Sequence, residues 1–333
     1  MTKMTRKDAL RQNPNLCLDE QLPRPKPFAA PTIFHEPWWL DVTTRGRIEM
    51  VESREHNKIV GRMYYLPVKR CGIVSSNMPP FTHFLGPAID PGPGSALTRH
   101  LKTLSITADL IEKLPRGSAF RQKMHRGVTD VLAFQAAGFE SLVQFTYEIQ
   151  PADEQTIWSG MRDKTRNAIR NGEKFHQITD ALDPDGFIDF YRKNVKSAGM
   201  TENVDLEIAR RLTQRCLEQR SGRFLLARDE NGVNKAAIFI VWDHHSCYYL
   251  MSTRAPDSSY GAIPALLWAA IKFAIANGLI FDFDGAVSDG AVKLFLGFGS
   301  VTTPRYIIER STTAYKLLRL LRRTLSDTSN PYC

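Results

Sequence analysis

The spacing of apolar residues changes along the chain between the period of a helix and that of a strand. Apolar positions near helical spacing predict an amphipathic helix over Ser95–Lys113, and alternation predicts a strand over Phe145–Ile149. The same patterns predict further helices over Phe34–Val42, Val128–Ala137, Asp153–Phe175, Phe187–Ser197, Asp205–Arg220 and Ile263–Asn277. They predict further strands over Arg47–Ser53, Lys58–Pro67, Ser118–Lys123, Arg223–Asp229, Lys235–Asp243, Cys247–Thr253, Ile280–Asp284 and Arg305–Glu309. Runs of strands with covering helices predict an α/β (α+β) fold.

Composition shifts divide the 333-residue chain into four parts. Residues 1–31 hold five prolines among charges and are expected to form a flexible tail. The same order of predicted elements occurs twice, in residues 32–150 and in residues 151–312: helices, an antiparallel meander, a helix and a further strand. We therefore expect two domains. Residues 313–333 begin with the basic amphipathic run Tyr315–Arg323, which is expected to pack on the domain or to touch anionic lipid or RNA.

The net charge of +9 fits an anionic ligand or partner but does not identify it. Five scattered cysteines without a CxxC pair argue against a disulfide framework or a zinc site, and they suit a reducing cytoplasm. The eight histidines show no metal-ligand spacing, so no metal is expected. The apolar stretch Ala262–Phe281 contains Lys272 near its middle, so we interpret it as a buried helix followed by a strand.

A stripe of cations marks the segment Trp158–Lys174. Four cations spaced by four residues would share one face of a helix, and Lys164 lies off that stripe; the four are Arg162, Arg166, Arg170 and Lys174. Such a row can hold phosphates through charged donors. The alternative is a solvated face with nearby acidic residues, and spacing alone leaves both interpretations open.

A polar loop precedes the predicted helix that begins near Ile263. Backbone N–H groups at a helix start can hold an anionic pyrophosphate or carboxylate, which would place Ser258, Ser259 and Gly261 at a ligand. An ordinary capped helix fits the same residues. The single glycine does not make a phosphate loop.

Two carboxylates stand at the end of the apolar strand Ile280–Asp284. The period of a strand would put Asp282 and Asp284 on one face. A carboxylate pair at a strand end suits a general base, because each group raises the pKa of the other. The alternative is a structural role in capping the following loop. The turn Gly297–Gly299, after Lys293, is a further candidate ligand contact.

The order of these segments resembles the FemAB-like branch of the GNAT acyltransferase superfamily, which includes the BioF2-like domain. The resemblance is carried by YEIQPADEQTIWSGMRDKTRNAIRNGEK, the strand meander, a helix ending in NGLIFDFDG, and then KLFLGFGS. It implies two GNAT-like domains, each a mixed, mostly antiparallel sheet flanked by helices. The family's basic helix matches Lys164, Arg166 and Arg170, and its acidic strand end matches Asp282, Asp284 and Gly285. Its later segment matches Lys293, Phe295, Phe298 and Gly299.

The resemblance implies an acyltransferase that moves an acetyl, other acyl or aminoacyl group to an amine of an envelope, polysaccharide or related acceptor. The donor would be acyl-CoA or aminoacyl-tRNA. Phe175 to Arg223 has no room for the family's coiled-coil arm, which argues against tRNA. The usual CoA signature is reduced to Arg254 and the Gly261–Ala262 pair, which argues against acetyl-CoA.

In the expected mechanism, strand N–H groups near Met251 and Thr253 polarise the donor carbonyl, Asp284 or Asp282 deprotonates the amine, and Tyr306 protonates the leaving group. The donor-binding residues are expected to be Met251, Thr253, Arg254, Ser258, Ser259, Gly261 and Ala262. The chain is expected in the cytoplasm, with peripheral contact to a membrane surface as an option. The rival hypothesis is a degenerate, non-catalytic module that binds an anionic ligand or RNA.

Overall fold

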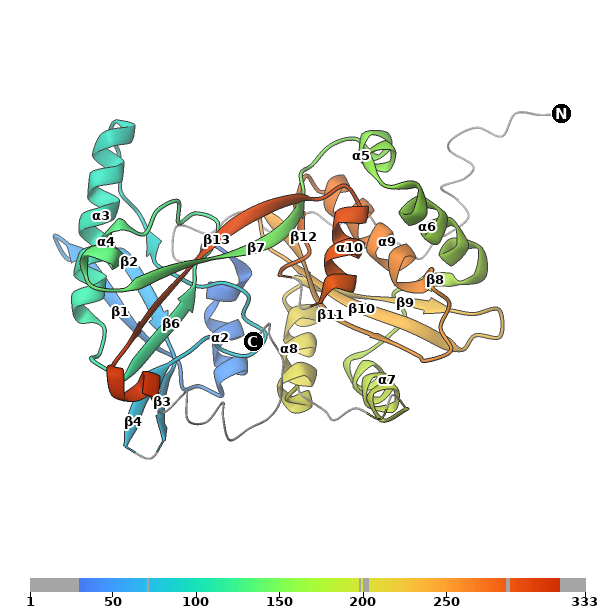
Figure 1. Cartoon of the computed structure of the whole chain (residues 1–333), viewed down its shortest axis with the longest axis horizontal. Helices are drawn as coiled ribbons and strands as arrows, with labels where there is room; N and C mark the ends of the chain where they lie inside the picture. The colour runs from blue at the N-terminus through green and yellow to red at the C-terminus, as the bar shows by residue number, and fades with distance from the viewer. Residues whose placement is uncertain (1–29, 71, 198, 200–203, 286–287, 318–333) are drawn as a thin grey trace. The chain divides into compact units, whose positions relative to one another are not determined.

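The fold is described from a computed structural model, which covers residues 30–70, 72–197, 199, 204–285 and 288–317. The chain forms two compact units (Figure 1). Of the described residues, the N-terminal unit holds 30–146, 285, 288–289 and 302–317, and the C-terminal unit holds 147–284 and 290–301. The expected tail lies outside the described residues except for its last two. The expected C-terminal helix is described only at 313–317, which is helical.

The N-terminal unit contains short helices and two groups of strands. Its helical elements are η2 (Ile33–His35), α2 (Pro37–Thr44), α3 (Ala96–Lys113) and α4 (Leu132–Ala136). Its strands are β1 (Glu49–Glu55), β2 (Lys58–Tyr65), β3 (Pro67–Arg70), β4 (Ile73–Ser76), β5 (Ala88–Ile89), β6 (Ala119–Lys123), most of β7 (Glu140–Ile149) and most of β13 (Val301–Ser311). The predicted helix over Ser95–Lys113 is confirmed, because the Ser95 hydroxyl accepts the N–H of Thr98 and so caps the first turn of α3.

Strands β1, β2 and β5 form one small sheet, and β3, β4, β6, β13 and β7 are neighbours in that order in a larger one. Helix α3 packs its apolar side on the small sheet and closes the core of this unit. That core is built from Val60, Met63, Tyr65, Ile106, Leu110, Ile111, Leu114, Phe120, Met124, Val131, Phe134, Phe139 and Ile308. The predicted helix Val128–Ala137 is wrong in its first turn, since α4 begins only at Leu132.

The C-terminal unit alternates helices with a twisted mixed sheet. Its helices are α5 (Glu154–Gly160), α6 (Asp163–Phe175), α7 (Pro184–Ser197), α8 (Leu206–Glu218), α9 (Ala262–Ala276) and α10 (Asp289–Gly297). Its strands are the end of β7, β8 (Gln177–Thr179), β9 (Gly222–Arg228), β10 (Asn234–Trp242), β11 (Ser246–Arg254) and β12 (Ile280–Asp282). The sheet order is β7-β12-β11-β10-β9-β8. The α/β (α+β) class is therefore confirmed.

Helices cover both faces of this second sheet (Figure 1). Trp242 of β10 packs on Phe273 of α9 with ring centroids 4.7 Å apart. Phe224 of β9 packs on Phe187 of α7 at 5.1 Å, on the other face. The buried helix and strand predicted for Ala262–Phe281 are α9 and β12, joined by Gly278 at φ +68°. No described helix is both long and apolar enough to cross a bilayer.

The prediction of one long helix over Asp153–Phe175 is wrong. Asp153 does cap a helix, because its carboxylate accepts the N–H of Thr156. The backbone, however, becomes extended at Met161 and Arg162, which end α5 and begin α6. Arg162 therefore lies outside the helix that carries Arg166 and Arg170, so the predicted four-residue stripe is interrupted. The helix α10 was not predicted at all.

Helices α6 and α9 approach each other at two glycines. A Cβ atom on Gly172 of α6 would lie 2.2 Å from the carbonyl oxygen of Gly261, and one on Gly261 would lie 2.5 Å from the backbone nitrogen of Gly172. Both positions face backbone atoms that no side-chain rotation can move. The crossing therefore requires glycine at both positions, and it fixes the start of α9 against α6.

We expect Gly172→Ala to lower the free energy of unfolding by about 2–3 kcal/mol, because overpacking forces the two helix backbones apart. Gly160→Ala is the matched control, since nothing lies within 4 Å of a Cβ atom at the end of α5. Its unfolding free energy should stay within about 1 kcal/mol of wild type. Urea unfolding followed by circular dichroism measures both, and equal stability of the two variants would contradict the crossing.

Candidate active site

Strand β11 keeps one edge without a strand partner over its second half. Its parallel pairing with β12 covers only Ser246, Cys247 and Tyr248, while β11 continues to Arg254. Among the described strands, only β10 pairs with β11 beyond that point. The register with β10 shifts where Ile240 opposes Tyr249 and Phe239 opposes Met251, so Leu250 is an extra residue in a β-bulge.

The edge without a partner presents backbone N–H and C=O groups that no neighbouring strand uses. Bulges are over-represented next to active sites because they redirect the strand and its groups. Met251, directly after the bulge, is half-buried, and Arg254 at the strand end is exposed. Thr253 is buried and its hydroxyl accepts the side-chain N–H of Asn194 on α7. Its side chain thus anchors β11 on α7.

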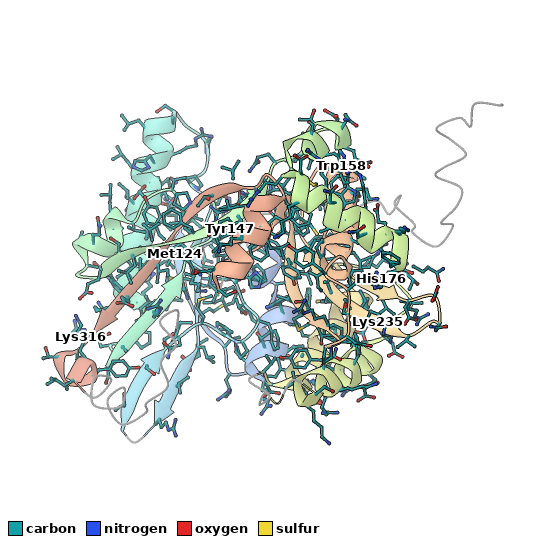
Figure 2. The ribbon with its side chains drawn as sticks, turned by 45° about the vertical axis from the view of Figure 1, so that its right-hand side comes forward. Met124, Tyr147, Trp158, His176, Lys235 and Lys316 are labelled. Carbon is teal, nitrogen blue, oxygen red and sulfur yellow. The ribbon has the colours of Figure 1, made fainter. Side chains whose placement is uncertain are left out.

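An aromatic cluster lies at the place where β11 and β12 part. The ring of Phe295 on α10 lies 6.2 Å from that of Tyr249 and 5.8 Å from that of Tyr147. Tyr147, which Figure 2 labels, stands near the end of β7. Phe295 also stacks on Phe283 at 4.7 Å, and Phe298 packs on Phe283 at 5.6 Å. Burial raises the pKa of Tyr249, which keeps its phenol protonated at neutral pH.

The start of α9 offers few free N–H groups. The N–H of Ala262 donates to the carbonyl of Ser259 at 3.3 Å. Pro264, the third residue of the helix, has no N–H to give. Of the three first helical positions, only Ile263 therefore keeps a donor for an anion. Gly261 is buried against α6, so its glycine requirement comes from helix packing.

The loop before α9 places its serines at or near the surface. Ser259 is exposed, and Ser258 is half-buried with its N–H donating to the carbonyl of Ala255 at 3.0 Å. Lys164 of α6 lies over the ring of Tyr260 at 5.8 Å from its centroid. The structure thus brings Lys164 close to the loop that sequence analysis assigned to the donor. The contact joins α6 to the residues directly before α9.

Arg166 and Arg170, two of the four cations predicted to hold phosphate, contact groups of the protein itself. Arg166 donates from Nη1 to the carbonyls of Trp158, Ser159 and Met161 at 3.2, 3.0 and 2.6 Å, and it pairs with Asp163. Trp158 and Ser159 lie in the last turn of α5 and Met161 directly follows it, so Arg166 caps the end of that helix. Arg170 is exposed, donates to the side-chain oxygen of Asn167 and lies 5.3 Å from the ring centroid of Trp158. Trp158 is labelled in Figure 2.

The two strand-end carboxylates do not share a strand face. Strand β12 ends at Asp282, which is 2% exposed, and Asp284 adopts φ +62° beyond it. The carboxylate of Asp282 accepts the N–H of Asp284 at 2.8 Å and so organises the turn. The prediction that period two puts both on one face is therefore wrong, because the chain turns directly after Asp282.

A second buried carboxylate lies beside Asp282 instead. Register pairs Tyr248 of β11 with Asp282, and Asp282 with Glu148 of β7, so the three side chains share one face of the sheet. Glu148 is 1% exposed and accepts the side-chain N–H of Gln150 at 3.1 Å. Burial, and then the carboxylate of Asp243, raise the pKa of Tyr248. Sequence analysis missed Glu148. Alternation within Phe145–Ile149 predicts a strand, but it does not show that this strand pairs with β12 and so brings Glu148 beside Asp282.

The remaining predicted residues are dispersed. Lys293 is exposed on α10, whereas Phe298 is 1% exposed and belongs to the aromatic packing. Tyr306 lies on β13 in the N-terminal unit, where it packs against that unit's core, so its role as an acid stays a prediction. Among the described residues, no group of three or more His, Cys, Asp and Glu side chains is placed to hold a metal ion.

Residues 159–289 match the family model described as an acetyltransferase (GNAT) domain. Three solved structures resemble the chain in fold, each over 86% of its length. FemX does so with a TM-score of 0.62 at 12% identity, over 93% of its own chain. The C-terminal domain of a protein described as a putative lysylphosphatidylglycerol synthetase, from Agrobacterium fabrum, has a TM-score of 0.54 at 11% sequence identity, over 90% of its own chain. L-PGS from Bacillus licheniformis has a TM-score of 0.52 at 10% sequence identity, also over 90% of its own chain. No curated protein sequence matches the chain.

These findings confirm the predicted resemblance to the FemAB-like, BioF2-like branch of the GNAT superfamily. The family match spans α6 to the start of α10 and so includes β11, α9 and β12. Residues 159–289 are therefore similar to a GNAT acetyltransferase domain, and the place where β11 and β12 part lies inside the matched segment. The identities are low enough that the solved structures speak for the fold alone.

We expect Arg166→Met to lower the free energy of unfolding by about 2 kcal/mol, because it strips the α5 carbonyls of a charged donor. Arg170→Met should cost under about 1 kcal/mol, as expected for an exposed cation–aromatic contact. Urea unfolding of both variants measures the difference. If Arg170→Met were the more damaging substitution, the capping role of Arg166 would be refuted.

Proposed function

We propose that the C-terminal unit is an N-acyltransferase site, in which an activated acyl donor lies along the edge of β11 that has no strand partner. The observation that carries the proposal is that β11 runs on from Tyr249 to Arg254 after its last pair with β12, with a bulge at Leu250. Strand N–H groups on such an edge donate to a carbonyl oxygen and stabilise the negative charge that develops there during acyl transfer.

Asp282 is the proposed general base for the amine acceptor. An amine must lose a proton to attack a carbonyl, and a carboxylate does this directly or through one water. Asp282 stands at the end of β12, where that strand leaves β11, and Glu148 lies beside it on β7. In this proposal Asp284 is a turn residue, because its N–H is bonded to Asp282 and its φ is positive. The proposed acceptor is an amine of an envelope, polysaccharide or related precursor, which rests on the family resemblance.

Both donor classes that the resemblance implies are anionic, and they make different demands on α9. The pyrophosphate of acyl-CoA needs several N–H donors at a helix start, and α9 leaves only that of Ile263 among its first three positions. An aminoacyl ester of tRNA needs only the carbonyl contact at β11 and cations such as Lys164 and Arg254. The small number of N–H donors at the start of α9 thus supports the aminoacyl-tRNA donor. The segment from Phe175 to Arg223 has no room for the family's coiled-coil arm, and this supports acyl-CoA instead.

We expect calorimetric titration of the whole chain to show binding of either acetyl-CoA or aminoacyl-tRNA in the micromolar range, with uncharged tRNA and free CoA as reference ligands. Ser259→Glu places a negative charge on the exposed loop and should weaken binding about fivefold or more at low salt. Ser105→Glu, exposed on α3 of the other unit, is the matched control and should bind like wild type. Absence of binding for both donors up to millimolar concentration would overturn the proposed donor site.

Asp282→Asn should lower the turnover number at least about 100-fold while donor affinity stays within about twofold, since the amide keeps the bond to the Asp284 N–H but cannot accept a proton. Asp284→Asn is the control and should keep turnover within about threefold, because asparagine tolerates the left-handed conformation. Release of the donor's leaving group in the presence of amine acceptors reports turnover. Full activity of Asp282→Asn would remove Asp282 from the mechanism.

A second candidate function is a non-catalytic binding module of GNAT fold. It is favoured by the internal use of Arg166 and by the poor supply of N–H donors at α9, both at positions where a donor would be held. Donor binding without any transfer, unchanged by Asp282→Asn, would support this alternative.

A further inference from the structure

An acidic residue stands in the loop that is proposed to face the donor. The loop 255–260 joins β11 to α9, and Asp257 precedes the two serines assigned to the donor. The side chain of Asp257 is 69% exposed. A free carboxylate at this position would repel both phosphate-containing donors, so the loop needs a compensating charge close by.

Lys235, the second residue of β10, supplies that charge (Figure 2). Its ammonium lies 2.7 Å from the Asp257 carboxylate and 3.4 Å from that of Asp229. Its carbonyl accepts the N–H of Ala255 at 2.8 Å, so backbone and side chain of the same residue hold the loop at two points. The Asp257 carboxylate is the main reason that the pKa of Lys235 is raised, and the hydrogen bond from Lys235 lowers the pKa of Asp257.

The position of Lys235 is fixed by the β9–β10 turn. One oxygen of Asp229 accepts the N–H groups of Asn231 and Val233 at 3.0 and 2.9 Å, which leaves the other oxygen to face Lys235. Only 16% of the Lys235 side chain is exposed, although it sits at the edge of a hairpin. An ammonium held on two carboxylates is more restrained than one in an ordinary surface ion pair.

We propose that Lys235 is a positioning residue: it tethers the β11–α9 loop to the β9–β10 turn and offsets part of the negative charge of Asp257 and Asp229, and in this way it sets the affinity of the site for an anionic donor. The second half of this statement rests on the proposed function. The first half concerns the free protein and stands without it. Lys235 takes no part in the chemical step, so it affects donor affinity and leaves turnover at saturating donor unchanged.

The experiment compares Lys235→Met, Lys235→Arg, Asp257→Asn and the double variant Lys235→Met/Asp257→Asn in the whole chain. Arg215→Met is the matched control, because it removes one positive charge from an ion pair with Glu218 on α8 and leaves the loop intact. Amide hydrogen exchange is measured first, without ligand. Lys235→Met should speed exchange in 255–260 about tenfold, and Lys235→Arg should keep the wild-type rate.

Donor affinity is then titrated with acetyl-CoA and with aminoacyl-tRNA at 20 mM and 500 mM salt. At low salt Lys235→Met should weaken binding about three- to tenfold, because the net charge of Lys235, Asp257 and Asp229 falls from −1 to −2. The double variant should return to within twofold of wild type, because its net charge at these three positions is again −1. At 500 mM salt the difference in donor affinity between Lys235→Met and wild type should shrink below about twofold, because salt screens the interaction between the exposed loop charge and the donor phosphates. Turnover at saturating donor should not change.

The outcomes separate the two proposals. A loss of affinity in Lys235→Met that is independent of salt and not restored in the double variant would overturn charge compensation. Exchange in 255–260 like that of wild type would overturn the tether. Faster exchange in a protein that binds neither donor would support the tether while refuting the proposed function. A loss of affinity in Arg215→Met equal to that in Lys235→Met would assign the effect to net charge and refute the role of Lys235.

Discussion

The contact between Gly172 and Gly261 is the constraint on which the candidate site depends. It lets α6 and α9 approach at backbone distance, and it sets where α9 begins. The loop from β11 must end at that point, so the geometry of the loop follows from the helix crossing. The position of Lys164 over Tyr260 follows as well, because Tyr260 is the residue directly before Gly261. A glycine that sequence analysis assigned to a ligand thus acts through packing, and it orders the same site indirectly.

The parting of β11 from β12 has a physical cause in the short length of β12. Its three residues pair with β11 on one side and with β7 on the other, and then the chain turns at Asp282. From there Phe283 enters the aromatic packing under α10, and Phe295 fills the space beside Tyr249. The ring of Phe295 on α10 thus packs where β12 has ended, while β11 continues along β10 alone. A sheet that stayed paired to Arg254 would have no strand edge to offer a ligand.

Much of the fold was predictable from local pattern. Local signals mark several elements: the helical period of α3, the proline at the first position of α2, the Asn-Gly turn between β9 and β10, and the glycine after α9. The break between α5 and α6 could not be predicted from local pattern, because it involves hydrogen bonds from Arg166 to carbonyls at the end of the previous helix. Helix α10 was missed since its glycines indicated a turn. The pairing of Asp282 with Glu148 is a contact across strands, and alternation within either strand does not reveal it.

Local pattern also does not show which side-chain donors are already used inside the protein. The predicted phosphate-binding residues are an example. Residue type and spacing show that Arg166 and Arg170 are cations on a helix, but not whether their donors are already used. Arg166 donates to three carbonyls inside the protein, so a phosphate would have to compete with bonds that also hold α5 in place. Lys164 and Arg254 are exposed, and binding an anion there would break no helix cap. In the proposed donor site, anion recognition therefore rests on the exposed cations Lys164 and Arg254 around a loop whose acidic residue pairs with Lys235, rather than on several N–H donors of a helix start.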